Sequence, residues 1–184
     1  MATVKSKSNM AAFTVLADRM HELAGKQVSA GWFKTAKYEN GTPVAYVASI
    51  QEFGIASKSI PPRPFMRPTI AAKTPEWRKI VEQGAKQILK GTQTIDGVLG
   101  QLGQSASDGI KESIIAVTAP PLSPITLELR AMKRKGIEIT GKTVGEAAHN
   151  VAQEGYVTPD VSTKPLVDEG IMLATATFLV EDVK

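Results

Sequence analysis

A proline-rich segment at residues 60–68, with the sequence I-P-P-R-P-F-M-R-P, constrains the fold of this chain more than any other feature. Four of its last eight residues are proline. Proline fixes φ and lacks a backbone donor, and it pushes the residue before it out of the α region. We therefore expect an extended strap here, rather than a helix or a central strand. The strap carries one large apolar side chain, Phe65, and two arginines, Arg63 and Arg67.

The length of 184 residues suits one domain with a substantial core, and we expect a single domain over residues 1–184. No apolar run reaches the roughly 18 residues that a membrane span needs. Lys5 and Lys7 are not followed by the apolar core of a signal peptide. The absence of cysteine excludes disulfides and thiolate chemistry, and it fits a protein made in a reducing cytoplasm.

The net charge of +4 is unevenly distributed along the chain. Residues 1–90 contain 14 Lys or Arg and 6 Asp or Glu, whereas residues 91–184 contain 8 and 12. Such a chain could bind nucleic acid through its first half, or it could stack head to tail with basic faces on acidic ones. A solvated surface with no partner explains the same charges.

Apolar periodicity and end signals predict several helices and few strands. The predicted starts are Asn9, Thr42-Pro43, Thr74-Pro75, Ser123-Pro124 and the capping box Thr143-x-x-Glu146. We expect helices at about 9–24, 43–53, 74–90, 94–117, 124–135, 143–154 and 166–173, and strands at 27–33 and 175–180. The expected fold class is α+β, a small antiparallel sheet packed with several helices, plus the proline-rich strap.

Two regions depart from this simple pattern. The segment 94–117 contains Gly97, Gly100 and Gly103 at three-residue spacing, and each glycine costs about 1 kcal/mol in a helix interior. Close approach of another element would compensate that cost, and a kinked segment is the alternative. Residues 136–163 are rich in loop-forming positions, so we interpret them as an inserted excursion.

Signals for an enzyme are weak. His21 and His149 lie in helical patterns without partners at metal-ligand spacing, and no nucleophile elbow, zinc motif or phosphate-binding loop is present. Asp168 and Glu169 are adjacent, so on a helix they would diverge by about 100° and make a poor catalytic pair. The sequence therefore predicts neither catalysis nor a metal or cofactor.

Nucleic-acid binding has somewhat better support. Arg63, Arg67, Arg78 and Lys79 could contact phosphates. No helix-turn-helix, zinc finger or aromatic RNA-binding motif accompanies them, and aromatic residues are too few for base stacking along a single strand. Contact with DNA, if it occurs, is expected to be independent of base sequence.

Two motifs resemble a known family. The first is V-A-Y-V-A-x-x-Q-E-F-G at residues 44–54, followed by the strap with its P-x-R-P-F core. The second is K-P-L-V-D-E-G-x-x-L at residues 164–173. Together they resemble the neck or tail-completion proteins of tailed bacteriophages, in which an E-F-G-like helix end precedes the strap and a K-P-L-x-D-T-G-x-L motif closes the domain. Glu169 stands where that family usually has threonine, and the 136–163 excursion is longer than expected.

The resemblance implies a structural virion protein without cofactor or turnover. It implies a homo-oligomeric ring, usually sixfold, at the head–tail junction or at the top of the tail, which lines a DNA channel and contacts neighbouring connector and tail proteins. It also implies assembly in the bacterial host cytoplasm. A tail-tube terminator, a minor tail protein or a baseplate component is the alternative within the class. A basic DNA-binding accessory protein is the alternative from another class.

The resemblance also supplies candidate interface residues. A rigid strap loses little conformational entropy on docking, so it suits a contact between neighbouring subunits. Phe65 could fill a neighbour's pocket or seal the core of its own subunit, and both alternatives stand at this point. The candidate residues are Pro62, Arg63, Pro64, Phe65 and Arg67 in the strap, Glu52, Phe53 and Gly54 at the helix end, and Pro165, Leu166, Asp168 and Gly170 in the C-terminal motif.

Overall fold

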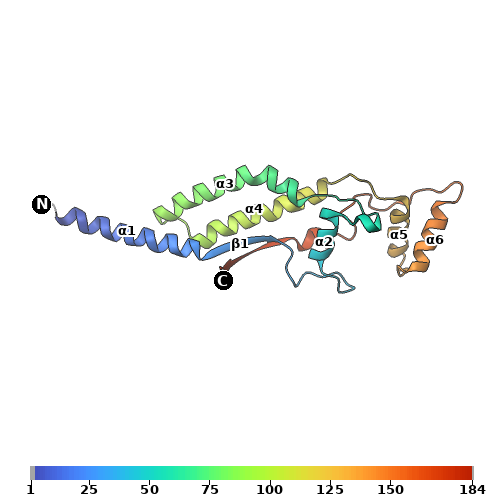
Figure 1. The fold of residues 1–184 in the computed structure, drawn as a ribbon, viewed down its shortest axis with the longest axis horizontal. Coiled ribbons are helices and arrows are strands. Elements are labelled where there is room, and N and C mark those ends of the chain that lie inside the picture. Colours follow the sequence, from blue (N-terminus) through green and yellow to red (C-terminus); the bar gives the residue numbers. More distant parts are fainter. Residues whose placement is uncertain (1–2, 184) are drawn as a thin grey trace. The chain divides into compact units, whose positions relative to one another are not determined.

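A computed structural model describes residues 3–183, with side chains from residue 13 onward (Figure 1). Backbone contacts divide the chain into two compact units. Unit 1 comprises Met1–Lys34, Arg67–Lys111 and Ala176–Lys184, and unit 2 comprises Thr35–Met66 and Glu112–Thr175. The expectation of a single domain stays a prediction.

The fold is α+β, as expected from the sequence. In the described part of the chain the helices are α1 (Thr3–Ala24), α2 (Val44–Phe53), α3 (Met66–Lys90), α4 (Ile95–Ala116), α5 (Pro124–Arg134), α6 (Gly141–Val151) and α7 (Ile171–Thr175), and a 3₁₀ turn covers Ala56–Lys58. Strands β1 (Lys26–Gly31) and β2 (Thr177–Asp182) form a two-stranded antiparallel sheet. Their register pairs Lys26 with Asp182 and Gly31 with Thr177.

Unit 1 is built around α3 and α4, which run side by side (Figure 1). Ile88 of α3 forms a buried apolar cluster with Ile95 and Val98 of α4. Gly84 allows the close approach, because a Cβ there would lie 2.3 Å from a methyl carbon of Val98. The helices that were predicted separately from their apolar spacing thus share one core.

The glycine stripe of α4 has its expected compensation at one of its three positions. A Cβ on Gly103 would lie 2.4 Å from the Phe178 ring and 2.8 Å from Val28, so the sheet packs directly on the helix backbone there. Gly100 faces open space, and Gly97 is close only to side chains of its own turn. Close packing therefore explains Gly103 and leaves the other two without a structural reason.

Unit 2 contains α2, α5, α6 and α7, with α5 packed on α6 and α2 in contact with α7. The Ser123 hydroxyl accepts the N–H of Thr126 at 3.2 Å and caps α5, as predicted. Leu127 of α5 and Ala147 of α6 are buried. Residues 136–163, predicted to be an excursion, thus contain a helix that covers the apolar side of α5.

Several predicted boundaries were wrong by a few residues. Helix α1 begins at Thr3 rather than Asn9, and the N-cap of α2 is Pro43, which makes no side-chain cap bond. The capping box of α6 uses Thr140 as N-cap with Thr143 at N3, three residues before the box that the sequence suggested. Helix α7 and strand β2 start at residues 171 and 177 rather than 166 and 175.

The largest correction concerns the strap and the helix after it. Only residues 61–65 of the strap lie outside helices, strands and β-bridges, because α3 begins at Met66 and continues through Pro75 to Lys90. Pro68 is tolerated because it lies in the first turn, where the backbone N–H has no partner within the helix. Thr74 is therefore an interior residue, and its hydroxyl donates to the Ile70 carbonyl at 2.5 Å.

Candidate functional site

The first motif forms a joint between the end of α2 and the start of α3. The Glu52 carboxylate accepts the backbone N–H groups of Phe65, at 2.7 Å, and Met66, at 2.9 Å. Glu52 lies in the last turn of α2, and its side chain is buried. It satisfies donors at the N-terminus of α3, where the helix dipole also favours a negative charge. The motif glutamate thus acts as a long-range helix cap.

Gly54 and Arg63 close the same joint. Gly54 has a φ of 71°, and a Cβ there would lie 2.6 Å from the Ile60 carbonyl oxygen and 2.8 Å from the Pro62 nitrogen. The backbone N–H of Arg63 donates to the Gln51 carbonyl at 2.7 Å. A side chain at position 54 would meet both strain and backbone, so the motif requires glycine there.

The Arg63 side chain points into its own chain. Its Nε donates to the Pro120 carbonyl at 2.8 Å and its Nη2 to the Pro121 carbonyl at 3.2 Å. Burial lowers the pKa of the guanidinium, which nevertheless stays charged in proteins. Arg63 therefore ties the strap to the segment between α4 and α5.

The second motif wraps around Arg130 of α5. Arg130 Nη1 donates to the carbonyls of Ser162, Lys164 and Val167 at 2.6, 3.0 and 3.3 Å. Its Nη2 donates to the Pro165 carbonyl at 3.3 Å, and its Nε lies 3.4 Å from Asp168 Oδ1. Burial lowers the pKa of this guanidinium, and the nearby Asp168 partly offsets that effect.

An open hollow of about 620 Å³ lies in unit 2 beside this cradle. All four candidate residues of the second motif line it, namely Pro165, Leu166, Asp168 and Gly170. Val47 and Met172 contribute apolar surface to the same lining. Acidic side chains supply much of the remaining lining, namely Glu39, Glu138, Asp168 and Glu169.

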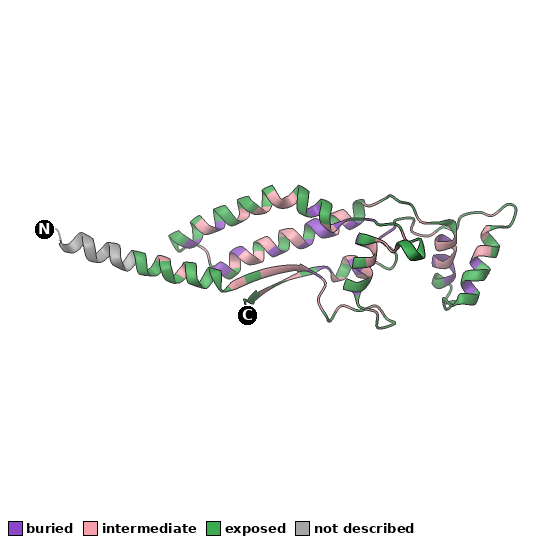
Figure 2. Cartoon of the chain, viewed as in Figure 1, coloured by how far each residue is buried: buried purple, intermediate pink, exposed green. Residues whose placement is uncertain are grey.

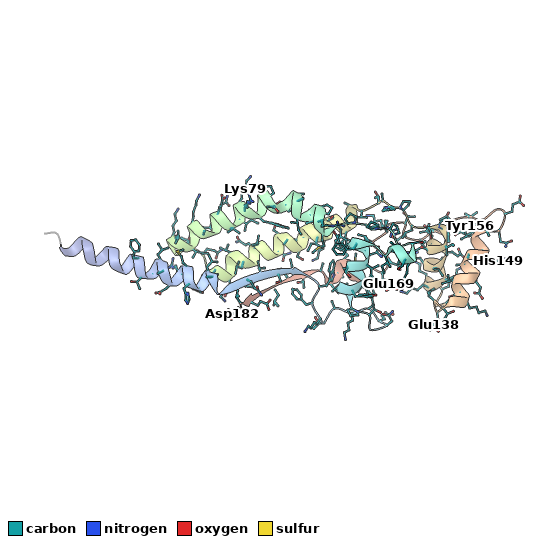
Figure 3. The ribbon with its side chains drawn as sticks, viewed as in Figure 1. Lys79, Glu138, His149, Tyr156, Glu169 and Asp182 are labelled. Carbon is teal, nitrogen blue, oxygen red and sulfur yellow. The ribbon has the colours of Figure 1, made fainter. Side chains whose placement is uncertain are left out.

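One ion pair and one partly buried phenol contribute to the electrostatics of the hollow. Lys133 Nζ lies 2.5 Å from Glu169 Oε1, and the hydrogen bond to Glu169 raises the pKa of Lys133. The pKa of Tyr38 is raised chiefly by burial, and then by the negative charges of Glu169 and Asp168. Glu169 and Glu138 are labelled in Figure 3. Arg130 and Lys133 also line the hollow and pair with Asp168 and Glu169, so Glu39 and Glu138 leave the lining with a net negative charge.

The predicted strap residues divide into buried and exposed sets. Phe65 is 0% exposed and Arg63 is 6% exposed, so neither side chain is presented to a neighbour. The interpretation in which Phe65 fills a neighbour's pocket was wrong, because its own chain encloses it. Pro62, Pro64 and Arg67 are exposed, and Phe53 at the helix end is 65% exposed. An intersubunit contact of the strap would use these residues.

Sequence reasoning missed Arg130, Tyr38 and Lys133. Arg130 follows Leu127 by three residues, so a helical pattern would have placed it on the buried side of α5. A charged residue on an apolar helix face indicates a dedicated partner, because a buried charge is costly unless it is paired. No comparable signal marks Tyr38, since its position depends on a turn that folds back on α7 and α5.

No cluster of three or more metal-ligating side chains occurs among the residues that the structure describes, and none of their helices is long and apolar enough to cross a membrane. His21 and His149 are exposed, and His149 contacts Gln153 of the following turn at 3.0 Å. The arrangement provides two hydrogen-bonded joints and, within unit 2, an open hollow.

Comparison with known protein families, with curated proteins and with solved structures finds no match for this chain.

Proposed function

We propose that this chain is a structural virion protein of a tailed bacteriophage, which forms a homo-oligomeric ring, sixfold in its simplest form, at the head–tail junction or at the top of the tail. In this role it completes and joins the tail, contacts neighbouring connector and tail proteins, and lines the DNA channel. It would be assembled in the bacterial host cytoplasm and then remain in the virion. The proposal includes neither a reaction nor a cofactor.

The observation that supports it is the role of the motif residues in the fold. Glu52 caps α3, Gly54 permits the turn, and Arg63 ties down the strap. The second motif is wrapped around Arg130. The motif residues thus hold together a scaffold, which is what a ring subunit of the resembled family requires.

Exposed apolar side chains give further support for a subunit that neighbours complete. Phe13, Met20, Phe53 and Val157 are 74, 63, 65 and 81% exposed. Phe13 and Met20 belong to unit 1, and Phe53 and Val157 belong to unit 2. Figure 2 shows exposed positions in green along α1, α3 and α6. In a cyclic ring, one face of each subunit fits a different face of the next, so both units would contribute to the contacts.

Mass spectrometry of purified virions tests this function by counting copies of the chain against the portal protein. About half the portal number is expected for one sixfold ring, because closed symmetry fixes the copy number. A count in the tens or hundreds would replace the ring with a tube or sheath component. Complete absence from virions would contradict the proposal and favour the DNA-binding accessory protein.

Within the same class, the alternative is a tail-tube terminator, a minor tail protein or a baseplate component. Immunogold labelling of virions with an antibody against this chain separates the two ends of the tail. Label at the head–tail junction or at the top of the tail supports the proposal, and label at the distal end of the tail contradicts it and favours a baseplate component.

A further inference from the structure

Helix α3 accounts for the net positive charge of this protein. Its 25 residues include six Lys or Arg and two Glu, a net charge of +4 that equals the formal net charge of the whole chain. The rest of the sequence is therefore balanced. A charge concentrated on one helix creates a local field that a uniformly spread charge would not.

The charge lies on one side of α3. Thr69, Gly84 and Ile88 are buried on the side that meets α4. At about 100° per residue, Arg78, Lys79, Lys86 and Lys90 fall on the opposite side, within an arc of roughly 120°. We name these four residues the basic face. All four are exposed, and Lys79 projects away from α4 (Figure 3).

The four cations of the basic face are left without ion pairs in the part of the chain that the structure describes. Neither an ion pair nor a side-chain hydrogen bond holds any of its four cations there. Lys73, on the side of α3 that meets Gly109 of α4, pairs with Glu76 at 3.5 Å. Glu82 is the acidic residue that lies among the four. With Glu82 subtracted from the four cations, three net positive charges are thus available to an anionic partner.

We propose that the basic face of α3 binds the phosphate backbone of duplex DNA. This inference rests on the proposed function for the identity of that DNA, which is the genome in the channel, and it assigns the contact to one helix. From Arg78 to Lys90 the face extends about 18 Å along the helix axis. Duplex DNA carries roughly ten phosphates over that length.

The surroundings of the face favour a duplex over other polyanions. Single-stranded nucleic acid needs aromatic side chains for base stacking, and the basic face has none. A membrane-surface helix inserts its apolar side between lipids, whereas Ile88 on the apolar side of α3 is packed on Ile95 and Val98 of α4. Backbone contact also carries no base specificity, in accord with the absence of a groove-reading motif.

Fluorescence anisotropy with a labelled 30-base-pair duplex tests the inference on the purified full-length chain. The variant replaces the basic face by Arg78→Gln, Lys79→Gln, Lys86→Gln and Lys90→Gln. The matched control removes the same four charges from exposed positions in unit 2, by Lys37→Gln, Lys58→Gln, Lys135→Gln and Lys164→Gln. Circular dichroism and the thermal midpoint establish that both variants fold.

With four phosphate contacts, binding should weaken about a hundredfold between 50 and 200 mM salt. The slope of the logarithm of the binding constant against the logarithm of the salt concentration should decrease in magnitude by about three to four in the basic-face variant. The control should retain the slope of the wild type. Equal losses in variant and control, or an unchanged slope in the variant, would overturn the inference. So would wild-type binding that is absent at 50 mM salt, or tighter binding to single strands or to phosphatidylserine vesicles.

This result is independent of the virion count. DNA binding through α3 by a chain that is absent from virions would leave the inference standing and reject the neck function. A chain present at ring stoichiometry whose basic face does not bind DNA would reject the inference alone.

Discussion

The Glu52 carboxylate accepts the backbone N–H of Phe65 at 2.7 Å, and the Phe65 side chain is fully buried. One contact therefore fixes both the start of α3 and the apolar side chain of the strap. The same carboxylate accepts the N–H of Met66 at 2.9 Å. Charged acceptors form hydrogen bonds about twice as strong as neutral ones, so much of the stability of this joint depends on the charge of Glu52.

Replacing Glu52 tests the joint directly. Glu52→Gln keeps an acceptor without the charge and should lower the free energy of unfolding by about 1 kcal/mol. Glu52→Ala leaves the two N–H groups without their acceptor and should lower it by about 2–3 kcal/mol. Urea denaturation measures both. Glu39→Gln, at an exposed position, is the control and should change it by less than about 0.5 kcal/mol. A decrease of less than about 0.5 kcal/mol in the free energy of unfolding of Glu52→Ala would contradict the role of Glu52 as the cap of α3.

Arg130→Lys tests the cradle of the C-terminal motif. A single ammonium cannot reproduce contacts made by three guanidinium nitrogens, so carbonyls of residues 162–167 lose their donors. The free energy of unfolding should fall by about 2–4 kcal/mol.

The matched control for the cradle is Arg134→Lys on the same helix. Arg134 makes one hydrogen bond, to the Asp160 carbonyl at 3.1 Å, and is exposed. Its replacement should cost less than about 0.5 kcal/mol. Equal losses in the two variants would show that the carbonyl cradle contributes nothing of its own.

Gly103→Ala tests the packing of the sheet on α4. An added methyl group would meet Phe178 at 2.4 Å, and overpacking of this kind costs about 1–3 kcal/mol. Gly100→Ala, one turn away on the same helix, faces open space and should stabilise the protein by up to about 1 kcal/mol through helix propensity. Thermal unfolding should show a lower midpoint for Gly103→Ala and a higher midpoint for Gly100→Ala than for the wild type. A stabilising Gly103→Ala would mean that the sheet lies farther from α4.

The sequence predicted those features that depend on neighbouring residues. Ser123-Pro124 starts α5, Gly54 ends α2, and Gly91 follows α3 with a φ of 73°. Each of these signals acts within one turn of a helix, through a side-chain oxygen or through the freedom of glycine. Local signals of this kind require no knowledge of the tertiary structure.

The features that it missed depend on distant partners. Pro68 and Pro75 favoured an extended strap and a later helix start, but Glu52, 13 residues before Phe65, caps an earlier start. In α6 the capping box predicted from Thr143 and Glu146 was wrong, because Thr140 caps the helix and Thr143 stands at N3. The role of Arg130 needs the chain at 162–168 to fold over α5, which no local pattern encodes.

The pKa of Tyr38 reports the acidic character of the hollow. Burial raises it above the ordinary 10.0, and Glu169 and Asp168 add to the effect. Ultraviolet titration of the wild type against Tyr38→Phe isolates this phenol. Glu169→Gln should lower the pKa of Tyr38 without returning it to the ordinary value, since burial remains. Glu138→Gln, at another acidic position of the lining, is the control and should leave it unchanged.

The same shift predicts a pH dependence of stability. A raised pKa means that the folded state holds the phenol proton more tightly, so the unfolded chain loses it first. The contribution of Tyr38 to stability is complete below 10.0 and declines as pH rises through the folded pKa. Urea denaturation between about pH 9 and 11 should therefore show a smaller loss of stability in Tyr38→Phe than in the wild type. If the free energy of unfolding falls equally with pH in Tyr38→Phe and in the wild type, the pKa of Tyr38 is not raised in the folded protein.

The contrast between Phe65 and Phe53 separates folding from assembly. Phe65→Ala removes a side chain that is 0% exposed and should lower the free energy of unfolding by about 3–5 kcal/mol, through lost burial and a cavity. Phe53→Ala removes one that is 65% exposed and should cost less than about 1 kcal/mol in the isolated chain. If neighbours cover Phe53 in the ring, Phe53→Ala should instead reduce ring formation, measured by analytical ultracentrifugation and negative-stain microscopy. Rings that form as readily in Phe53→Ala as in the wild type would place the contact elsewhere on the subunit.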